Sequence, residues 1–433
     1  KLGNVDLYSG HALSLSTPRP LLVEQEASVQ SGTDMALSFG PATGIFHQGQ
    51  IETRSYLNNA GTLFAGGRTT LSSSAGLPIS VDNSGILGGV SALVLGSVAQ
   101  PADILNQATG QVLGGDFSLV LRDLTNFGLV QDVSSHLSSL SAQNLVNQSG
   151  GRILSYDAVG GNGKLDLAAD SLENHGLIYS GRSLAEISAG RLINHEGAGI
   201  GTGGSLFLTS KAGDTPIVPA APTLLNLGDI FGLNLFFSYG YVVNGVDPGL
   251  TANQGRQRAA IRAVGRIAGT ALARMDNFGE MSSQTDDIFL SLYGDFNNRM
   301  SAPPTSFGAA SPYFGSTRGD YGNTSDSGAK ISYTKSGTSE DYYVWTVAVS
   351  TRAYQDVIQY FTQDEHFDFT PLAPNVFAGR DLVIRTQGNV NNIGGSLAAS
   401  RDANITANQF TNQSLDLTRK TFKRLSTDKL SCF

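Results

Sequence analysis

The sequence has one cysteine, few charged residues and no long apolar run. The single cysteine, Cys432, cannot form a disulfide within the chain, so the fold must be stable without covalent cross-links. Charged residues make up 15% of the 433 residues, and the formal net charge is −8. Proteins that bind nucleic acid need a basic surface to displace counterions from phosphate, so the composition argues against that class of partner.

The most apolar stretch is IFGLNLFFSYGYVV, residues 230–243. A helix needs about 20 apolar residues to cross a bilayer, so this stretch is too short for one and is predicted to form core strands. The chain begins with Lys1, and no charged and apolar leader follows it. We therefore expect an internal piece of a longer protein, without a signal peptide of its own.

Motifs of common enzymes are also lacking. The sequence contains no phosphate-binding loop, no His-Glu-x-x-His zinc motif and no nucleophile elbow. The carboxylates Asp166, Asp170 and Glu173 lie in one repeat without a matching cluster one repeat away, whereas general acid–base catalysis needs two groups in reach of one bond. The chain is therefore not expected to be an enzyme or to hold a cofactor.

Glycine is abundant, with 52 residues, and it recurs together with asparagine. Asparagine followed shortly by glycine returns at intervals of 24, 23, 20, 21, 27 and 20 residues. The series is Asn59, Asn83, Asn106, Asn126, Asn147, Asn174 and Asn194, and the pattern returns at Asn277, Asn297, Asn392 and Asn412. Glycine is expected to provide turns with positive φ. Asparagine is expected either to adopt the left-handed conformation or to hydrogen-bond the turn backbone.

Short runs of alternating apolar residues lie between these asparagines. Examples are Leu165 with Leu167 and Leu206 with Leu208, whereas no repeat unit carries the 3.6-residue stripe of a helix. A strand this short cannot bury one face alone, but similar coils stacked on one another form a continuous core. The sequence therefore predicts an all-β fold, a β-solenoid with coils of about 20 residues.

Two non-repeat insertions are predicted to interrupt the coils. One begins with the proline-rich DTPIVPAAP, and the other contains seven of the 14 tyrosines and the only tryptophan. The predicted organisation is repeat coils over 1–212, an apolar and arginine-rich interruption over 213–262, repeat coils over 263–300, an aromatic-rich insertion over 301–372, repeat coils over 373–415 and a basic C-terminal tail over 416–433.

Two histidines occupy equivalent places in neighbouring repeats. His175 directly follows Asn174, and His195 directly follows Asn194. Stacked coils would bring the two imidazoles together, where they could share a metal ion. Because no third ligand is repeated beside them, a solvated corner without a metal is predicted instead.

The aromatic-rich insertion supplies the candidates for receptor binding. They are Tyr313, Tyr321, Tyr342, Tyr343, Trp345 and Tyr354. Tyrosine and tryptophan bury a large area and keep a polar group, which suits a binding surface. The alternative, that these aromatics form a small core of the insertion, stays open because Trp345 alternates with valines as in a strand. The insertion also contains Arg318, Gly319 and Asp320, a tripeptide that integrins can read at an exposed loop tip.

Four arginines are candidates for binding an anionic partner. They are Arg256, Arg258, Arg262 and Arg266, and no acidic residue occurs within 251–275. Their spacing fits a basic helix on an anionic membrane, but the stretch also fits a repeat unit. A strand with a solvated arginine edge is the favoured interpretation, and an anionic partner stays open.

Repeats such as LNNAGTLFAGGRTTLSS and SLENHGLIYSGRSLAEISAGRLIN resemble those of filamentous hemagglutinins and contact-dependent growth inhibition effectors, large exoproteins of bacterial two-partner secretion. The resemblance covers about residues 45–212, 263–300 and 373–415. YYVWTVAVSTRAYQDVIQYF is similar to the Tyr/Pro-rich segment that precedes a second repeat block in the growth-inhibition effectors. Their secretion domain with its Asn-Pro-Asn motif and their toxin domain with its Val-Glu-Asn-Asn boundary do not occur in this sequence.

The resemblance implies a right-handed parallel β-helix that is exported through an outer-membrane two-partner transporter. It also implies that the region between repeat blocks meets a receptor on a host cell or a neighbouring bacterium. We therefore expect a secreted or surface-bound adhesin that acts as a stalk and a receptor-binding segment, in host-cell adhesion, as in virulence, or in contact-dependent growth inhibition. A purely structural spacer and a β-helix enzyme acting on polysaccharide are the alternatives.

Overall fold

The structure, a computed structural model, is built almost entirely from strands. It describes residues 1–433 except 48–49, 133–136, 156–163, 182–183, 212–222, 251–252, 254–255, 302–313, 318–330, 337–341, 348–353, 368–372, 416–417 and 432–433. No α-helix occurs in the described part of the chain. The chain divides into two compact units. The first unit is Lys1–Asp247, Gly255–Met300 and Pro374–Asn412, and the second is Pro248–Gln254, Ser301–Ala373 and Gln413–Phe433.

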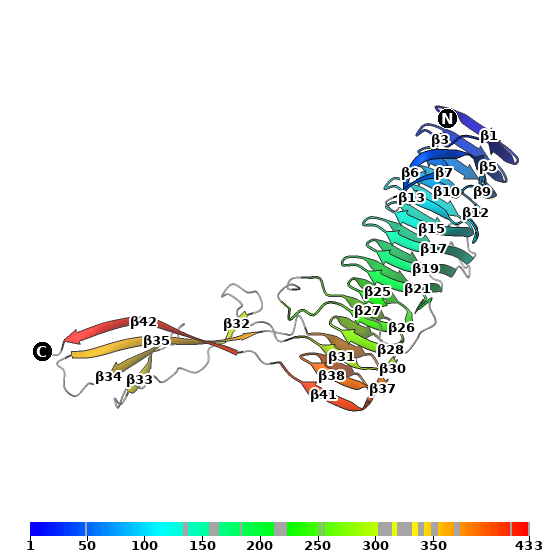
Figure 1. Ribbon diagram of the computed structural model, residues 1–433. Coiled ribbons are helices and arrows are strands. Elements are labelled where there is room, and N and C mark those ends of the chain that lie inside the picture. Colours follow the sequence, from blue (N-terminus) through cyan, green and yellow to red (C-terminus); the bar gives the residue numbers. More distant parts are fainter. Residues whose placement is uncertain are drawn as a thin grey trace. The chain divides into compact units, whose positions relative to one another are not determined.

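Two long sheets form the first unit, with strands that stack from β1 to β41 (Figure 1). The first sheet contains β1 (Asp6–Ser9), β4 (Ser28–Ser31), β8 (Thr62–Ala65), β11 (Ile86–Gly89), β14 (Gln111–Gly114), β16 (Leu129–Asp132), β18 (Arg152–Ser155), β20 (Leu177–Ser180), β22 (Gly199–Thr202), β25 (Asp229–Gly232), β27 (Ala260–Ala263), β29 (Glu280–Ser283), β36 (Asn375–Ala378) and β39 (Ser396–Ala399). Each of these strands pairs in parallel with the strand of the next coil.

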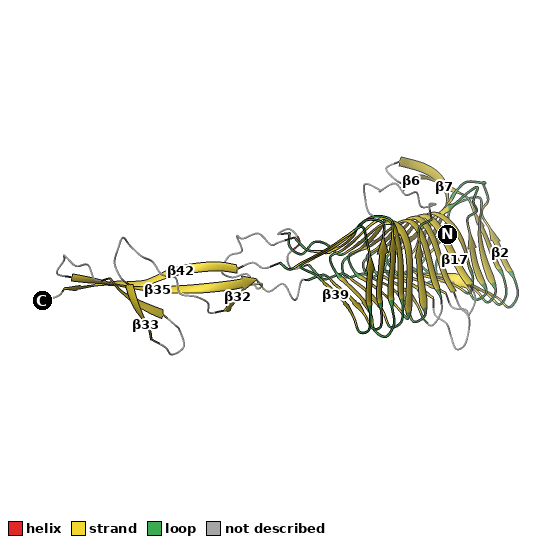
Figure 2. Cartoon of the chain, turned by 90° about the horizontal axis from the view of Figure 1, so that it is seen from below, coloured by secondary structure: helices red, strands yellow, loops and turns green. Residues whose placement is uncertain are grey.

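The second sheet is longer and is parallel except at one hairpin, β6 with β7. It contains β2 (Leu13–Ser16), β3 (Leu21–Val23), β5 (Met35–Phe39), β6 (Pro41–His47), β7 (Gln50–Asn59), β9 (Arg68–Ser73), β10 (Ile79–Asn83), β12 (Ala92–Leu95), β13 (Ala102–Asn106), β15 (Phe117–Asn126), β17 (Leu137–Asn147), β19 (Lys164–Asn174), β21 (Ala185–Asn194), β23 (Ser205–Thr209), β24 (Leu224–Asn226), β26 (Asn234–Asn244), β28 (Ile267–Asn277), β30 (Ile288–Leu292), β31 (Phe296–Arg299), β37 (Leu382–Thr386), β38 (Asn389–Ile393), β40 (Ala403–Thr406) and β41 (Gln409–Gln413). Figure 2 shows the loops that join the strands around each coil. The chain is thus all-β with long parallel sheets, an arrangement compatible with a β-solenoid.

One apolar residue of each first-sheet strand points inward, and these residues stack in register along the unit. The column is Val29, Leu63, Leu87, Val112, Val130, Ile153, Ile178, Ile200, Ile230, Ile261, Met281 and Val376, each at most 1% exposed. A single strand of four residues could not exclude water from such a side chain. The neighbouring coils do so, which is why short alternating runs suffice.

A ladder of asparagines, buried except for the last one, runs beside this core with one residue per coil. Nδ2 of each asparagine donates a hydrogen bond of 2.7–2.8 Å to Oδ1 of the next. The ladder is Asn59, Asn83, Asn106, Asn126, Asn147, Asn174, Asn194, Asn226, Asn244, Asn277, Asn298, Asn392 and Asn412. The same amides donate to turn carbonyls, as Asn126 does to Gly128 at 3.1 Å, which confirms the predicted bond to the turn backbone. The bonds between side chains were not predicted.

Glycines that follow the ladder asparagines serve two purposes, and only some of them have the predicted positive φ. Gly128 and Gly176 are not among the glycines with positive φ. A Cβ on Gly128 would lie 2.3 Å from the backbone oxygen of Gly110, and one on Gly176 would lie 2.1 Å from that of Gly151. Any side chain there would hold the coils apart. Others have the predicted positive φ, among them Gly150, Gly197 and Gly394, which follow Asn147, Asn194 and Asn392 and have φ of +84°, +77° and +64°.

The structure differs from the sequence prediction over residues 213–262. Four strands of the stack, β24 to β27, lie in this range, and Asn226 and Asn244 belong to the ladder. The stretch 230–243 forms β25 and most of β26, as predicted for core strands, with Phe237 only 5% exposed. These coils were missed because the ladder intervals there are irregular, 32, 18 and 33 residues.

The stack continues in register from residue 300 to residue 374. Strand β29 pairs with β36, and Nδ2 of Asn298 donates to Oδ1 of Asn392 at 2.7 Å although 94 residues separate them. The predicted anchor Asn297 is therefore wrong by one position. Its Nδ2 donates instead to Oδ1 of Asp276, at 2.6 Å.

The second unit contains a third sheet, which is antiparallel. Its strands are β32 (Phe314–Thr317), β33 (Ile331–Ser336), β34 (Tyr342–Val347), β35 (Tyr354–Phe367) and β42 (Thr418–Ser431). β33 pairs with β34, and β35 pairs with β32, β34 and β42. Most of the predicted basic tail, 416–433, is thus the strand β42 of this sheet.

At the β6–β7 hairpin lies a network of charges in which Arg54 and Asp103 are buried. Arg54 on β7 is 2% exposed and forms ion pairs with Glu52, at 2.7 Å, and with Asp103. Arg122 forms a second ion pair with Asp103, at 2.9 Å. A buried guanidinium without an anion would be unstable, so this hairpin depends on the matching charges of the coils that it contacts.

Candidate functional site

Four of the predicted receptor-binding residues lie in the third sheet. Tyr342, Tyr343 and Trp345 lie on β34, and Tyr354 begins β35. In the strand register, Trp345 is opposite Ile358, and Tyr354 is opposite Ser431 of β42. The remaining predicted residues lie outside the described part of the chain, namely Tyr313, Arg318, Gly319, Asp320 and Tyr321.

The four candidate arginines lie in and around the strands β27 and β28 and not in a helix, as the favoured interpretation expected. They are Arg256, Arg258, Arg262 and Arg266. The guanidinium of Arg262 donates to both carboxylate oxygens of Glu280, at 3.1 and 3.2 Å, and lies 3.4 Å from Asp229. Arg266 lies 3.7 Å from Asp287. Acidic residues of neighbouring coils therefore balance this stretch, although the stretch itself contains none.

A cleft of about 650 Å³ lies on the outer face of the first sheet. Its floor is a column of outward residues that follow one another in register across six strands. The column is Tyr179, Gly201, Phe231, Arg262, Ser282 and Phe377. The rings of Tyr179 and Phe231 are stacked, with centroids 6.0 Å apart. Gly201 permits this arrangement, because a Cβ there would lie 2.4 Å from the Phe231 ring.

The residues of this cleft suit binding better than catalysis. The aromatic rings offer an apolar face, and the Arg262–Glu280 pair offers polar contacts beside it. The hydrogen bonds from Arg262 lower the pKa of Glu280, so this carboxylate stays ionised and cannot act as a general acid near neutral pH. The sequence analysis missed this cleft. A usable signal existed, because Tyr179 and Phe231 each lie five residues after a ladder asparagine.

A second cleft, also of about 650 Å³, lies on the second sheet and contains three carboxylates. Each of them is bound by another side chain. Gln107 donates to Asp82 at 3.0 Å, Asn144 donates to Asp123 at 2.7 Å, and Asp103 pairs with the arginines described above. Each of the three carboxylates therefore already has a hydrogen-bond or ion-pair partner within the protein.

The carboxylates Asp166 and Asp170, considered for catalysis from the sequence, line neither cleft. Asp170 pairs with Lys211 at 2.7 Å. The structure adds a neighbour that the sequence analysis missed, because Glu186 lies in register with Asp166 on the next coil. Both residues have further interactions, so they are not a free acid–base pair.

Within the described residues, no helix is long and apolar enough to cross a membrane. The candidate surfaces are the outward faces of the stacked strands in the first unit and, separately, the antiparallel third sheet in the second. Comparison of the chain with protein-family models, curated proteins and solved structures found no match.

Proposed function

We propose that the chain belongs to a large secreted bacterial surface exoprotein, in which the stacked coils are a stalk and the third sheet meets a receptor. In this proposal the stack is a right-handed parallel β-helix with coils of about 20 residues, exported through an outer-membrane two-partner transporter. The receptor lies on a host cell or on a neighbouring bacterium. The resemblance of the repeats to hemagglutinin-type exoproteins is the starting point.

One observation carries the assignment of separate roles to the two units. The ladder passes from Asn298 to Asn392 and the first sheet passes from β29 to β36 without a change of register. The stack therefore needs nothing from residues 301–373 to continue. Because the stack keeps its register without this insertion, the insertion is better explained by a role outside the stack. The tyrosines and the tryptophan of the insertion are of the types enriched at binding surfaces.

The test measures binding of the purified chain to cultured epithelial cells and to bacterial cells by flow cytometry. One variant lacks residues 301–373 and 413–433. This deletion removes β35 and β42 together, so that no strand of the third sheet remains without its partner. A second variant carries Tyr179→Ser and Phe231→Ser in the first-sheet cleft. Far-UV circular dichroism checks that both variants keep the β stack.

We expect the deletion to abolish cell binding and the cleft variant to retain it. Binding that survives the deletion but is lost with the cleft variant would move the receptor site to the first sheet. A parent chain that binds neither cell type would contradict the adhesin proposal and favour the structural spacer. Asp320→Glu tests the tripeptide separately, because it keeps the charge and lengthens the side chain.

A further inference from the structure

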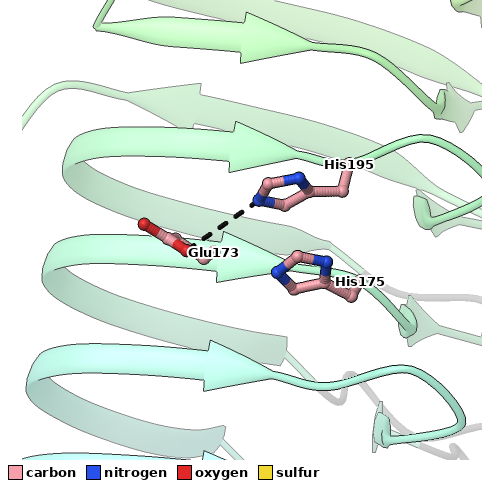
Figure 3. Close-up of side chains that lie close together, drawn as sticks. All are labelled: Glu173, His175 and His195. Atoms are coloured by element: carbon pink, nitrogen blue, oxygen red, sulfur yellow. Dashed lines mark ion pairs between the residues drawn. The ribbon is translucent and has the colours of Figure 1, made fainter.

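Three side chains on two neighbouring coils gather on the outer surface of the second sheet. Glu173 lies on β19, His175 directly follows that strand, and His195 directly follows β21 (Figure 3). The ladder residues Asn174 and Asn194 point inward, so strand alternation sends Glu173 and His175 outward together. This explains how a third group reaches the histidines without being repeated in the sequence.

The backbone holds the two histidines in register. Nδ2 of Asn174 donates to Oδ1 of Asn194 at 2.8 Å. The backbone N–H of His175 donates to the oxygen of Asn147 at 2.7 Å, and that of His195 donates to the oxygen of Asn174 at 2.8 Å. Both imidazoles therefore project from well-ordered positions one coil apart, and no movement of the strands is needed to bring them together.

The side chains are close and incompletely partnered. The imidazole rings are stacked, with centroids 3.6 Å apart and an angle of 12° between their planes. Nε2 of His195 lies 3.9 Å from Oε2 of Glu173, is buried, and has no hydrogen-bond partner among the described residues. One ligand atom from each of the three side chains lies within 4.8 Å of the other two.

We propose that Glu173, His175 and His195 bind one zinc-class divalent transition metal ion, which bridges two coils of the stack. Two histidines and a carboxylate are a known ligand set for zinc with an open coordination position, and a water molecule would complete the tetrahedron. Such a metal prefers imidazole nitrogen, whereas Mg²⁺ and Ca²⁺ prefer oxygen ligands only. The inference does not depend on the proposed adhesin function.

The residue types at the site suit a divalent cation. Neutral imidazole is the form that binds metals. The carboxylate of Glu173 supplies the negative charge that a divalent cation needs.

Binding requires the imidazoles to tilt but leaves the backbone in place. Two nitrogens on one zinc ion lie roughly 3.3 Å apart, given Zn–N bonds of about 2.0–2.1 Å. Parallel rings cannot both direct a lone pair at one ion, so at least one ring must rotate about its χ2 torsion. That torsion has a broad energy profile, and both rings are at the surface, so the rotation is accessible.

One such site is expected in the column that holds the histidines, within the part of the chain that the structure describes. The backbone pattern that holds them continues with Gln148 on the coil before and Leu227 on the coil after. Neither side chain is a usual zinc ligand, so these two neighbouring positions do not extend the site along the column.

The test titrates the full chain, without a histidine tag, with ZnCl₂ by isothermal calorimetry. The variants are His195→Gln and Glu173→Gln, and the matched control is His11→Gln, which removes an exposed histidine elsewhere in the same unit. We expect saturable binding of one zinc ion, weakened by roughly tenfold or more in each site variant and unchanged in the control. Absence of saturable binding, or equal affinity in the parent and His195→Gln, overturns the proposal.

Two measurements keep the test valid if a variant folds poorly. Nitrogen-15 NMR of the parent chain follows the imidazole resonances of His175 and His195 as zinc is added, and both must shift together at one equivalent. Electron paramagnetic resonance with Cu²⁺ must show coupling to two imidazole nitrogens. Resonance shifts at only one histidine, or coupling to a single nitrogen, would mean a stacked pair of rings without a shared metal.

Discussion

The first unit and the third sheet are both built from strands, but their strands find partners in different ways. In the first unit a strand pairs in parallel with its counterpart one coil later, as Asn126 of β15 does with Asn147 of β17, 21 residues on. In the third sheet β35 pairs antiparallel with β42, which brings Tyr354 opposite Ser431. The first kind of pairing repeats the same environment at similar intervals, and the second kind does not.

This difference explains why the strands of the first unit could be predicted from the sequence and those of the third sheet could not. In a stack, each inward residue has equivalent residues above and below it, so the same residue type suits every coil and a column becomes a sequence repeat. A strand in an antiparallel sheet meets unlike partners. The stability that a substitution costs the stack should therefore depend on the column to which the substituted residue belongs.

The largest effect is expected from a charge in the apolar core. Leu167 is 0% exposed and pairs with Leu140 and Ile187 on the two neighbouring coils. Leu167→Asp buries a carboxylate without a partner and should lower the free energy of unfolding by on the order of 4 kcal/mol or more. Urea denaturation followed by circular dichroism measures the change. Ala168→Asp, one residue away and facing outward, is the control and should change the stability by less than about 0.5 kcal/mol.

The next effect concerns the one antiparallel hairpin of the first unit. Arg54→Met removes a guanidinium that is 2% exposed and with it one of the two ion pairs of Asp103 described above. Loss of one partner from a buried ion pair should cost about 3 kcal/mol, measured by the same denaturation. The double variant Arg54→Met with Asp103→Leu should recover much of this loss. If the single variant is as stable as the parent, the charges do not hold the hairpin.

The repeat pattern was enough to predict the all-β stack and most of the ladder. Columns of leucine, isoleucine and valine needed only alternation, and the asparagines from Asn59 to Asn194 needed only their spacing. Asn226 and Asn244 were missed because insertions between coils make the spacing irregular there, although the ladder bonds continue across them.

The surface features were harder to predict because they join different columns. Arg262 pairs with Glu280 and Asp229, which lie 18 and 33 residues away along the chain. Counting the charges in a short stretch of sequence does not reveal such pairs. Glu173 belongs to a different column from the histidines. No residue repeated from coil to coil therefore points to its contact with His195. The pairing of β35 with β42 joins segments that share no sequence pattern, and the sequence analysis therefore assigned them to an insertion and a tail.

The ladder itself should show a graded response. Asn126→Ala removes the acceptor of Asn106 and the donor to Asn147, which leaves two buried amides without that partner. The expected cost is about 2 kcal/mol. Asn412→Ala, at the exposed end of the ladder, should cost less than about 0.5 kcal/mol. Equal costs at the two positions would mean that the amide bonds contribute little and that the asparagines serve only the turn.

A smaller effect is expected at the Arg262–Glu280 pair, and it depends on pH. The folded chain holds the pKa of Glu280 below its usual value of 4.5, mainly through hydrogen bonds from Arg262. The unfolded chain therefore takes up this proton first as the pH falls. The contribution of Glu280 to stability is present above about pH 4.5 and is lost as the pH drops through the folded pKa. Glu280→Gln should make stability less dependent on pH in that range, by about 1 kcal/mol or less. An unchanged pH profile would contradict this.

The smallest effect is expected from removing the third sheet. The variant that lacks residues 301–373 and 413–433, with Met300 joined to Pro374 by a Gly-Ser linker, keeps the bond from Asn298 to Asn392 and that from the N–H of Met300 to the oxygen of Ile393. Because both of these bonds lie within the stack, its free energy of unfolding should stay within about 0.5 kcal/mol of the parent. Amide hydrogen exchange gives the local readout. Protection at Asn298 and Asn392 should match the parent, and faster exchange at these two amides would show that the third sheet holds the stack together after all.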